Sequence, residues 1–483
     1  MVFKKRSLAS KSDNISDWYN DVVVQARLAD YSDVRGCMII RPNGYAIWER
    51  TQAVLDAMFK KDGVQNAYFP LFIPYSLLKI EKEHLKGFSP ELAMVEYAGG
   101  EKLAEPYAVR PTSETIMYKT FADWIKSYRD LPLKINQWCN VVRWEKRTRP
   151  FLRTTEFLWQ EGHTVHRKED EAVEMAMRAL AWYKTLYEEY YAISTYTGIK
   201  SESEKFAGAK TTYSAEIVIP DGKALQGATA HNLADNFSRA FNIEFLDEEG
   251  EKSHPFQTSW GFSTRAIGGL ILTHGDDAGI ILPPNIAATQ VVVVVIKGKD
   301  ETQEELVLKY AREIREDLEN QGIRALIDEN TKHSLGYRIN EWELYGIPLR
   351  LEIGSKEFEA KSAVSVRRDT FERRTLAKND VVSEIPKILK AIQQNLLEKS
   401  EATKNRLTIE ATTFAEFQDI LTTKHAFIRA PWCEKAECEK QIKSKTKATT
   451  RVLELENIEK RSPAPCVHCG EKAQRKWLFA QSY

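Results

Sequence analysis

The sequence lacks any long hydrophobic run and any excess of charge of one sign. No apolar stretch approaches the ~20 residues that span a bilayer, and no apolar signal-peptide segment follows the N-terminal lysines. Lys and Arg number 69, as do Asp and Glu, and a net charge of zero argues against a protein covered in phosphate-binding surface. We therefore expect no membrane partner and a cytoplasmic protein, an organellar one being the alternative.

What is present is ordinary for a globular protein of several domains. Of the 483 residues, 43% are hydrophobic and 29% are charged, and there is no repeat or low-complexity tract. Apolar spacing predicts helices after Pro42 and over 169–191, and a proline-broken strand over 68–74. Strands and helices alternate over 291–369, as in an α/β domain, and a long helix follows from Ser383 to about Lys404. We expect domains at 1–285, 286–400 and 401–483.

Cysteine is scarce until the C-terminal region, where four of the six cysteines form two close pairs. The pairs can bring four thiolates to the corners of a tetrahedron, the geometry that structural zinc prefers. Such a closed site holds a small domain together and is not where chemistry is expected; four free thiols are the alternative. His468 could replace one thiolate, although we expect it outside the shell. The predicted zinc ligands are Cys433, Cys438, Cys466 and Cys469.

The same region is locally basic. From Lys424 onward, thirteen Lys or Arg residues face seven acidic ones. A basic surface of this kind could meet nucleic acid even though the whole chain is neutral.

Charged and aromatic side chains share one face of a predicted hairpin, VVRWEKRTRPFLRTTEFLWQEGHTVH, over residues 141–166. Such a face is often simply solvated, but the aromatics favour a pocket for a flat ring and charged groups. Arg143 suits a carboxylate or phosphate, and Glu145 an exocyclic amine. Alternation along the second arm places these side chains on one face: Arg153, Thr155, Phe157, Trp159, Glu161 and His163.

Several separated motifs resemble, in order, those of the class II aminoacyl-tRNA synthetases. They are the helix from Gly44 to Pro70, the R-x-E hairpin with FLWQEGHT, and SWGFSTRAIGG at 259–269. RPTSET at 110–115, LQGATAH at 225–231 and the cysteine-bearing C-terminal region narrow the resemblance to the prolyl-tRNA synthetases, of the archaeal and eukaryotic-like type. The resemblance covers essentially the whole chain.

The resemblance implies an α+β catalytic domain, an antiparallel sheet flanked by helices. An α/β anticodon-binding domain and a small zinc-binding α+β domain would follow. The segment 47–70 would form the interface of a homodimer. The implied reaction joins L-proline to tRNA(Pro), with ATP and Mg2+, through prolyl-adenylate. The alternatives are a non-catalytic tRNA-binding regulator and a related class II enzyme for threonine, serine or glycine.

By resemblance, the ATP site draws on the hairpin and two later motifs. Arg143 would bind the α-phosphate and the substrate carboxylate, and with Arg265 it would form the catalytic pair. Phe157 and Arg265 would sandwich adenine, while Glu145 would accept from its amine. The remaining ATP positions are Thr154, Thr155, Gln226, Thr229 and Ser263, with Gln226 near magnesium.

In the implied proline site, a protein carboxylate meets the ammonium group of proline and an arginine meets its carboxylate. An indole packs against the proline ring. Thr112 and Glu114 also fit a helix N-cap with an early acidic residue, and His231 alone would be a structural histidine. Glu161 and His163 either brace the pocket or touch the ligand. The proline-binding residues are Thr112, Glu114, Arg143, Trp159, Glu161, His163 and His231.

Further predictions concern the anticodon-binding domain, an editing insertion and two loop positions. Glu343, Arg350 and Lys356 fall where the family reads anticodon bases, although surface charges are often only solvated. About ninety residues separate the hairpin from SWGF, too few for a large editing insertion. Phe371 stands where relatives commonly have glycine. HGDD at 274–277 reads as a turn and not as a metal site.

Overall fold

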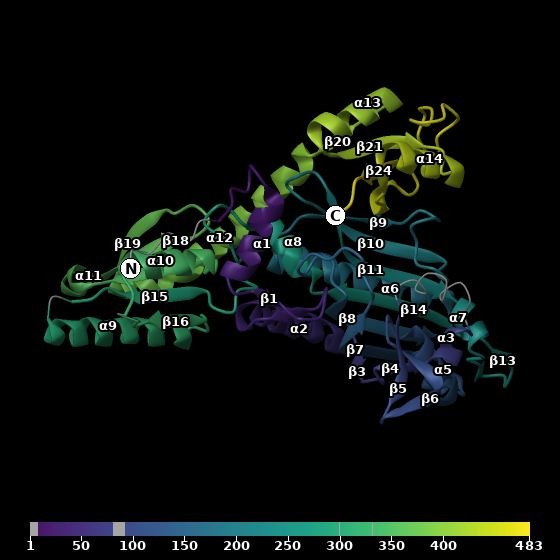
Figure 1. Ribbon diagram of the computed structural model, residues 1–483, viewed down its shortest axis with the longest axis horizontal. Coiled ribbons are helices and arrows are strands. Elements are labelled where there is room, and N and C mark those ends of the chain that lie inside the picture. The colour runs from purple at the N-terminus through teal and green to yellow at the C-terminus, as the bar shows by residue number, and fades with distance from the viewer. Residues whose placement is uncertain (1–7, 81–91, 299, 331) are drawn as a thin grey trace.

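The computed structural model describes residues 8–80, 92–298, 300–330 and 332–483. Figure 1 shows the α/β domain on the left, the large catalytic sheet on the right and the C-terminal domain above that sheet. Lys4 and Lys5, behind which no signal peptide is predicted, fall within 1–7, outside the described residues. Among the described residues, no helix combines the length and apolar character needed to cross a membrane.

The catalytic domain is built on an eight-stranded sheet with the order β23-β9-β10-β11-β14-β8-β7-β3. Its strands pair antiparallel except for β3, which runs parallel to β7. This is the class II type of sheet that the motifs imply. Its strands are β3 (Gln65–Asn66), β7 (Leu133–Val142), β8 (Glu156–His166), β9 (Thr195–Ile199), β10 (Thr211–Val218), β11 (Ala224–Ala234), β14 (Phe256–Ser263) and β23 (Leu453–Glu454).

Helices cover this sheet with apolar faces that the sequence periodicity predicts. Helix α2 begins at Pro42, a first-turn position that suits proline, and buries Ile47, Leu55 and Phe59. The catalytic domain contains α1 (Ile15–Gln25), α2 (Pro42–Lys61), α3 (Tyr75–Leu78), α5 (Glu114–Trp124), α6 (Glu169–Thr185, continued as a π-helix over Leu186–Tyr190), α7 (Asn236–Ala240) and α8 (Arg265–His274).

Smaller strand pairs complete the domain. The predicted strand over 68–74 is shorter than expected, because only Phe72–Pro74 pairs, with β6. These elements are β1 (Ala29–Tyr31) with β2 (Met38–Ile40), β4 (Phe72–Pro74) with β6 (Glu101–Val109) and β5 (Ala93–Ala98), and β12 (Phe245–Leu246) with β13 (Lys252–Ser253).

The predicted hairpin is correct in its second arm and wrong at its turn. Strand β7 ends at Val142 and β8 begins at Glu156, so Arg143, Glu145, Arg153 and Thr155 lie in the connecting loop. One further bond, from the Arg143 amide to the Thr155 carbonyl at 2.8 Å, extends the ladder. The arms meet again only at an isolated antiparallel bridge between Arg149 and Arg153, which encloses Pro150, a residue with no amide hydrogen to donate.

The α/β domain holds a mixed sheet with the order β16-β15-β17-β18-β19. Strand β15 is parallel to both neighbours and entirely buried, which explains its unbroken run of valines. The elements are β15 (Val291–Val295), α9 (Glu301–Asn320), β16 (Ala325–Asp328), α10 (Leu335–Leu344), β17 (Leu349–Ile353), α11 (Ser355–Glu359), β18 (Ser362–Arg367) and β19 (Arg373–Ala377).

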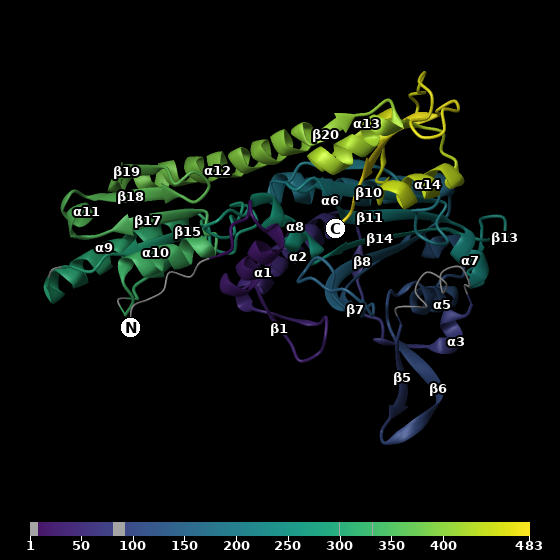
Figure 2. The same ribbon diagram turned by 45° about the horizontal axis from the view of Figure 1, so that its top comes forward.

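The long helix α12 (Lys378–Arg406) begins five residues before the predicted start, and Figure 2 shows it running from the α/β domain to the C-terminal domain. That domain has a four-stranded sheet with the order β20-β21-β24-β22. Its elements are β20 (Thr408–Glu410), α13 (Phe414–Asp419, continued as a π-helix over Ile420–Lys424), β21 (Phe427–Trp432), α14 (Ala436–Thr446), β22 (Thr449–Thr450) and β24 (Arg475–Ala480).

The C-terminal domain also completes the catalytic sheet. Leu453 and Glu454, as β23, pair with Ile199 and Gly198 at the edge of that sheet. A Cβ at Gly198 would lie 2.1 Å from the Leu453 carbonyl oxygen, so only glycine allows this approach. The division at 285 and 400 stays a prediction, with α12 continuous across its second boundary.

Candidate active site

A pocket of about 230 Å3 opens on one face of the catalytic sheet. Strand register builds it, because side chains at matching positions of four strands lie in rows. One row runs from His163 through Ser259 and His231 to Thr212. The residues predicted to bind proline all line this pocket: Thr112, Glu114, Arg143, Trp159, Glu161, His163 and His231.

On the opposite face, the Trp260 ring lies against Gly162. A Cβ at Gly162 would lie 2.2 Å from the Trp260 ring, which explains the glycine between Glu161 and His163. Glu161 and His163 therefore both point toward the pocket, while the indole of Trp260 covers the other face of the strand at Gly162.

Glu161 braces the start of helix α5. Its carboxylate accepts from the Ser113 hydroxyl at 2.5 Å, the Ser113 amide at 3.1 Å and the Gln137 amide nitrogen at 2.9 Å. Burial acts to raise the pKa of Glu161, but hydrogen bonds from His163, Ser113 and Gln137 outweigh it and lower this pKa. The ionised carboxylate thus holds the RPTSET segment against β8.

That segment presents Thr112 and Glu114 to the pocket. The Thr112 hydroxyl donates to the Glu114 carboxylate, and Glu114 is the first residue of α5. Ser113 is the N-cap, without a side-chain cap bond, and Glu114 is the acidic residue of the first turn, so the segment also forms the helix start that its sequence suggests. Negative charge is favoured at a helix N-terminus, so this carboxylate is positioned to receive a cation.

The two histidines occupy different environments. His163 contacts Glu161 through Nε2 and the Tyr118 hydroxyl through Nδ1, both at 3.1 Å. His231 Nδ1 lies 2.9 Å from the Thr212 hydroxyl, and its ring stacks on Phe206 with centroids 4.5 Å apart. Burial lowers the pKa of His231 to about 3, so this imidazole is neutral at pH 7.

Arg143 lies between the RPTSET segment and the hairpin aromatics. Its Nε donates to the Pro111 carbonyl at 3.0 Å, and its guanidinium lies 5.4 Å from the ring centres of both Phe157 and Trp159. The indole nitrogen of Trp159 lies 3.3 Å from Cys139 Sγ. Anchoring by a carbonyl and two rings fixes the direction of the guanidinium.

Only some of the residues predicted for ATP lie in the pocket. Gln226 and Thr229 line it, from β11. Ser263 and Arg265 follow at the junction of β14 and α8, where Arg265 Nε donates to the Leu152 carbonyl at 3.0 Å. They lie outside its lining, as do Glu145, Thr154, Thr155 and Phe157.

The loop residues among them have partners of their own. Glu145 forms an ion pair with Arg153 at 2.8 Å. The Thr155 amide donates to the Gly36 carbonyl at 2.8 Å. The buried Thr154 hydroxyl has no partner among the described residues. These positions therefore lie in the loop between β7 and β8, outside the lining of the pocket.

Several lining residues were not predicted, among them Glu204, Lys205 and Phe206. They belong to the loop 200–210, which carries no motif, so nothing in the sequence singles them out. Thr212 had a signal, because Thr212, Ser214 and Glu216 form a polar alternation in an otherwise buried strand.

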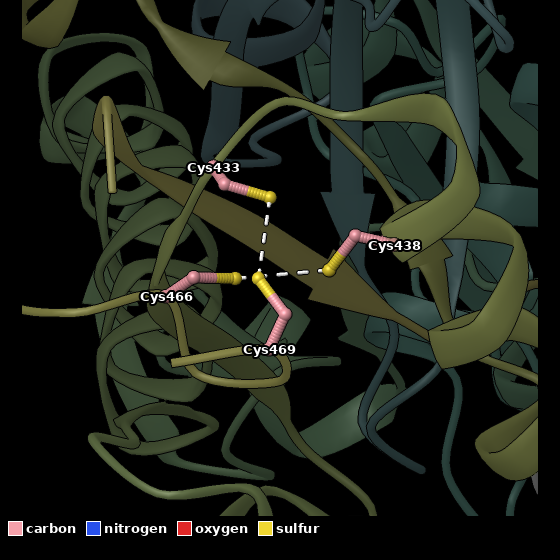
Figure 3. A group of neighbouring side chains, drawn as sticks. All are labelled: Cys433, Cys438, Cys466 and Cys469. Atoms are coloured by element: carbon pink, nitrogen blue, oxygen red, sulfur yellow. Dashed lines mark hydrogen bonds between the residues drawn. The ribbon is translucent and has the colours of Figure 1, made fainter. Parts of the chain in front are cut away.

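The four C-terminal cysteines converge, as Figure 3 shows. Their sulfur atoms all lie within 4.8 Å of one another, with Cys438 to Cys466 and Cys433 to Cys469 both at 3.7 Å. Zinc to sulfur bonds of about 2.3 Å in a tetrahedron require sulfur atoms about 3.8 Å apart. The four thiolates therefore fit a zinc ion, and His468, with Nδ1 3.5 Å from Cys438 Sγ, lies beside them.

The residues predicted for the anticodon are only partly together. Arg350 Nη1 donates to Glu343 at 3.0 Å, and both line a small pocket. Lys356 is exposed on α11 and is not part of that lining.

HGDD forms a turn, as expected. The Asp276 amide donates to the Gly279 carbonyl at 2.9 Å, and the Asp276 carboxylate binds Arg368. His274 Nε2 lies 2.9 Å from the Tyr191 carbonyl. The HGDD side chains are therefore engaged in contacts that stabilise the junction between the domains.

Three family models match the chain: tRNA synthetase class II core domain (G, H, P, S and T) over 95–274, anticodon binding domain over 290–388, and prolyl-tRNA synthetase, C-terminal, over 414–483. Fold, pocket and the first two matches define a class II aminoacyl-tRNA synthetase. The proline–tRNA ligase of Chlorobium limicola is 49% identical over 482 residues, covering 99% of each chain, and that of Rubrobacter xylanophilus is 51% identical over 453 residues, covering 94% of each. The chain belongs to the prolyl-tRNA synthetase family and is an enzyme that charges tRNA with proline.

A solved structure agrees with this assignment. The prolyl-tRNA synthetase of Cryptosporidium parvum, complexed with halofuginone and AMPPNP, is 42% identical. It matches with a TM-score of 0.95, covering 99% of this chain and 98% of that one.

Proposed function

We propose that the enzyme charges tRNA(Pro) in two steps at the pocket described above. A carboxylate oxygen of L-proline attacks the α-phosphorus of ATP, the bond to the β-phosphate breaks, and pyrophosphate leaves. A hydroxyl at the tRNA 3′ end then attacks the carbonyl carbon of prolyl-adenylate, and AMP leaves. The observation that carries this proposal is the convergence of Glu114, Arg143 and Trp159 on one pocket.

Each of these groups meets one part of proline. The Glu114 carboxylate pairs with the secondary ammonium, and Arg143 forks onto the carboxylate. The Trp159 indole walls the compact ring. Glu161 and His163 act from behind, because the carboxylate that fixes Ser113 also fixes its neighbours Thr112 and Glu114. His231 is neutral and completes the polar floor.

ATP lies toward the hairpin turn. Arg143 bridges the proline carboxylate and the α-phosphate, while Arg265 and Phe157 hold adenine from its two faces and Glu145 accepts from its amine. Thr154, Thr155, Thr229 and Ser263 supply further contacts. The side-chain oxygen of Gln226 would help to hold magnesium, which would neutralise phosphate charge. Catalysis then consists of positioning and charge stabilisation, with no nucleophilic side chain.

A single-turnover experiment tests the two steps. With proline, ATP labelled at the α-phosphate and no tRNA, labelled prolyl-adenylate should accumulate on the enzyme. Addition of tRNA(Pro) should convert it to AMP and prolyl-tRNA. Label release that requires tRNA from the start would contradict a separate first step.

We expect the pocket to discriminate weakly against alanine. A pocket sized for proline cannot reject a smaller side chain strongly, since each lost methylene is worth only about 1 to 3 kcal/mol. Between the hairpin and SWGF, the described residues form the strands and helices of the catalytic domain and no separate editing domain. Alanine-dependent exchange of pyrophosphate into ATP should therefore be measurable. A preference for proline beyond about 10^5-fold, without proofreading, would be inconsistent with this pocket.

The four cysteines are proposed to hold one structural zinc ion. Bound there, zinc would cross-link the turn after β21, the start of α14 and the segment before β24. Purified enzyme should contain about one zinc ion per chain by mass spectrometry, and Cys466→Ser should contain far less and unfold at a lower temperature. Cys37→Ser, remote from the cluster, is the matched control. Full zinc content in Cys466→Ser would contradict the assignment.

The enzyme is proposed to work in the cytoplasm as a homodimer formed through the region of α2. Large apolar side chains are exposed around this helix, including Tyr31, Ile39, Tyr45 and Tyr68. A cluster of exposed apolar side chains of this kind is typical of a protein–protein interface. Sedimentation equilibrium should give twice the mass of one chain, and Tyr68→Glu should weaken the association. A monomer at micromolar concentration would contradict it.

The α/β domain is proposed to read anticodon bases with Glu343, Arg350 and Lys356. Arginine and lysine complement guanine edges, and glutamate accepts from amino groups. The ion pair between Glu343 and Arg350 fixes both at one pocket, and the exposed Lys356 would reach a neighbouring nucleotide.

A further inference from the structure

The loop between β18 and β19 contains a phenylalanine in an unfavourable conformation. The backbone of Phe371 has φ +58°, which lies in the left-handed region. Residues other than glycine and asparagine rarely adopt this conformation. Its side chain is nevertheless 45% exposed. The ring therefore gains little from burial and costs conformational energy, so folding alone does not explain it.

The ring is held firmly from one side. The Arg368 guanidinium lies 5.2 Å from the centre of the Phe371 ring. Arg368 is itself immobilised, since Nη1 and Nη2 bind the Asp276 carboxylate at 2.8 and 2.6 Å and Nε donates to the Glu343 carbonyl at 2.8 Å. A cation packed against one face stabilises the ring in place and leaves its exposed surface directed to solvent.

This ring stands beside hydrogen-bonding groups that suit a nucleobase edge. Phe371 lines the same small pocket as Glu343 and Arg350. Arg350 is held by Glu343 at 3.0 Å and by Glu352 at 2.9 Å. Proteins recognise unpaired bases by combining such edge contacts with an aromatic platform.

We propose that Phe371 stacks on a base of the anticodon loop while Glu343 and Arg350 contact base edges. This inference rests on the proposed anticodon reading and adds a residue to it. The favourable stacking offsets the strained backbone only when tRNA is bound. Phe371 therefore contributes to tRNA affinity and has no part in prolyl-adenylate formation.

The test compares variants that separate the ring from the backbone. Phe371→Gly removes both ring and strain, Phe371→Asn removes the ring but tolerates the conformation, and Phe371→Trp keeps an aromatic face. Stacking of one base corresponds to about 5- to 150-fold in affinity. We expect the KM for tRNA(Pro) to rise about tenfold in Phe371→Gly and Phe371→Asn, and to stay within about twofold in Phe371→Trp.

Two further readouts exclude a structural role. Proline-dependent pyrophosphate exchange should be unchanged in all three variants, and Phe371→Gly should unfold at or above the wild-type temperature. Leu306→Ala, on the exposed part of α9, is the control for loss of an exposed apolar side chain. An unchanged KM for tRNA in Phe371→Gly, or an equal loss of pyrophosphate exchange, would overturn the proposal.

A tRNA lacking one anticodon base separates this inference from the anticodon assignment. Removing the stacked base should weaken binding by wild type at least as much as Phe371→Gly does, and should weaken that variant by a smaller factor than it weakens wild type. If each abasic position weakens both proteins equally, Phe371 does not stack. If Arg350→Ala leaves the KM for tRNA unchanged while Phe371→Gly raises it, the assignment of Arg350 fails and the stacking stands.

Discussion

Replacing Arg143 with alanine is expected to lower kcat/KM for proline-dependent pyrophosphate exchange by about a thousandfold. In the proposed mechanism the guanidinium bridges the proline carboxylate and the α-phosphate, whose charges repel as they approach. Loss of a single charge-stabilising donor costs about 10^2 to 10^3 in rate. The Pro111 carbonyl and the two aromatic rings hold this guanidinium in place.

Arg312→Ala is the control for this measurement. Arg312 is exposed on α9 and pairs with Glu329, far from the pocket in sequence and in a different domain. Its exchange activity should equal that of wild type. An Arg143→Ala enzyme within tenfold of wild type would show that another group neutralises the carboxylate and the phosphate.

Replacing Arg451 with alanine is expected to destabilise the protein by about 3 to 5 kcal/mol, the cost of breaking a buried charge pair. Glu216, fully buried on β10, accepts from Arg451 Nη2 at 2.6 Å, Arg451 Nε at 3.0 Å and Lys200 Nζ at 2.6 Å. Arg451 belongs to the C-terminal domain and Glu216 to the catalytic sheet. Without the guanidinium, a desolvated carboxylate oxygen loses its partner at the domain interface. Denaturant unfolding measures the loss.

Acid should also remove the stabilisation that the ion pair between Glu216 and Arg451 provides. Burial raises the pKa of Glu216, but Arg451 and Lys200 outweigh it and bring this pKa from 4.5 to about 2. A carboxyl with a depressed pKa in the folded state stabilises fully above its unfolded value, and the stabilisation is lost as the pH falls from about 4.5 to 2. The difference in stability between wild type and Arg451→Ala should shrink over that range.

Lys476→Ala supplies the comparison, because its pair with Glu410 is exposed and worth about 1 kcal/mol or less. An Arg451→Ala protein no less stable than Lys476→Ala would contradict the importance of the buried pair. So would a stability difference that stays constant down to pH 2.

The sequence predicts the structure of this protein well where a feature depends only on neighbouring residues in the chain. Alternation along β8 placed Phe157, Trp159, Glu161 and His163 on one face because side-chain period follows from strand geometry alone. The same counting was wrong for Arg143 and Arg153, because the strand ends depend on where Pro150 and the turn interrupt the hydrogen bonds.

Long-range features were not predictable from local pattern. Strand β23 is two residues long, and its place at the edge of the catalytic sheet depends on an approach between Leu453 and Gly198 across some 250 positions. Phe206 reaches the pocket from a polar loop without periodicity. The ion pair that occupies Glu145 also depends on the folded loop.

The central claim is that the pocket activates proline, and a panel of amino acids in the pyrophosphate exchange assay tests it most directly. With ATP, magnesium and each amino acid in turn, the enzyme should exchange pyrophosphate strongly with proline and weakly with alanine. Threonine, serine and glycine should give no more exchange than alanine. Exchange with one of these amino acids and none with proline would contradict the account.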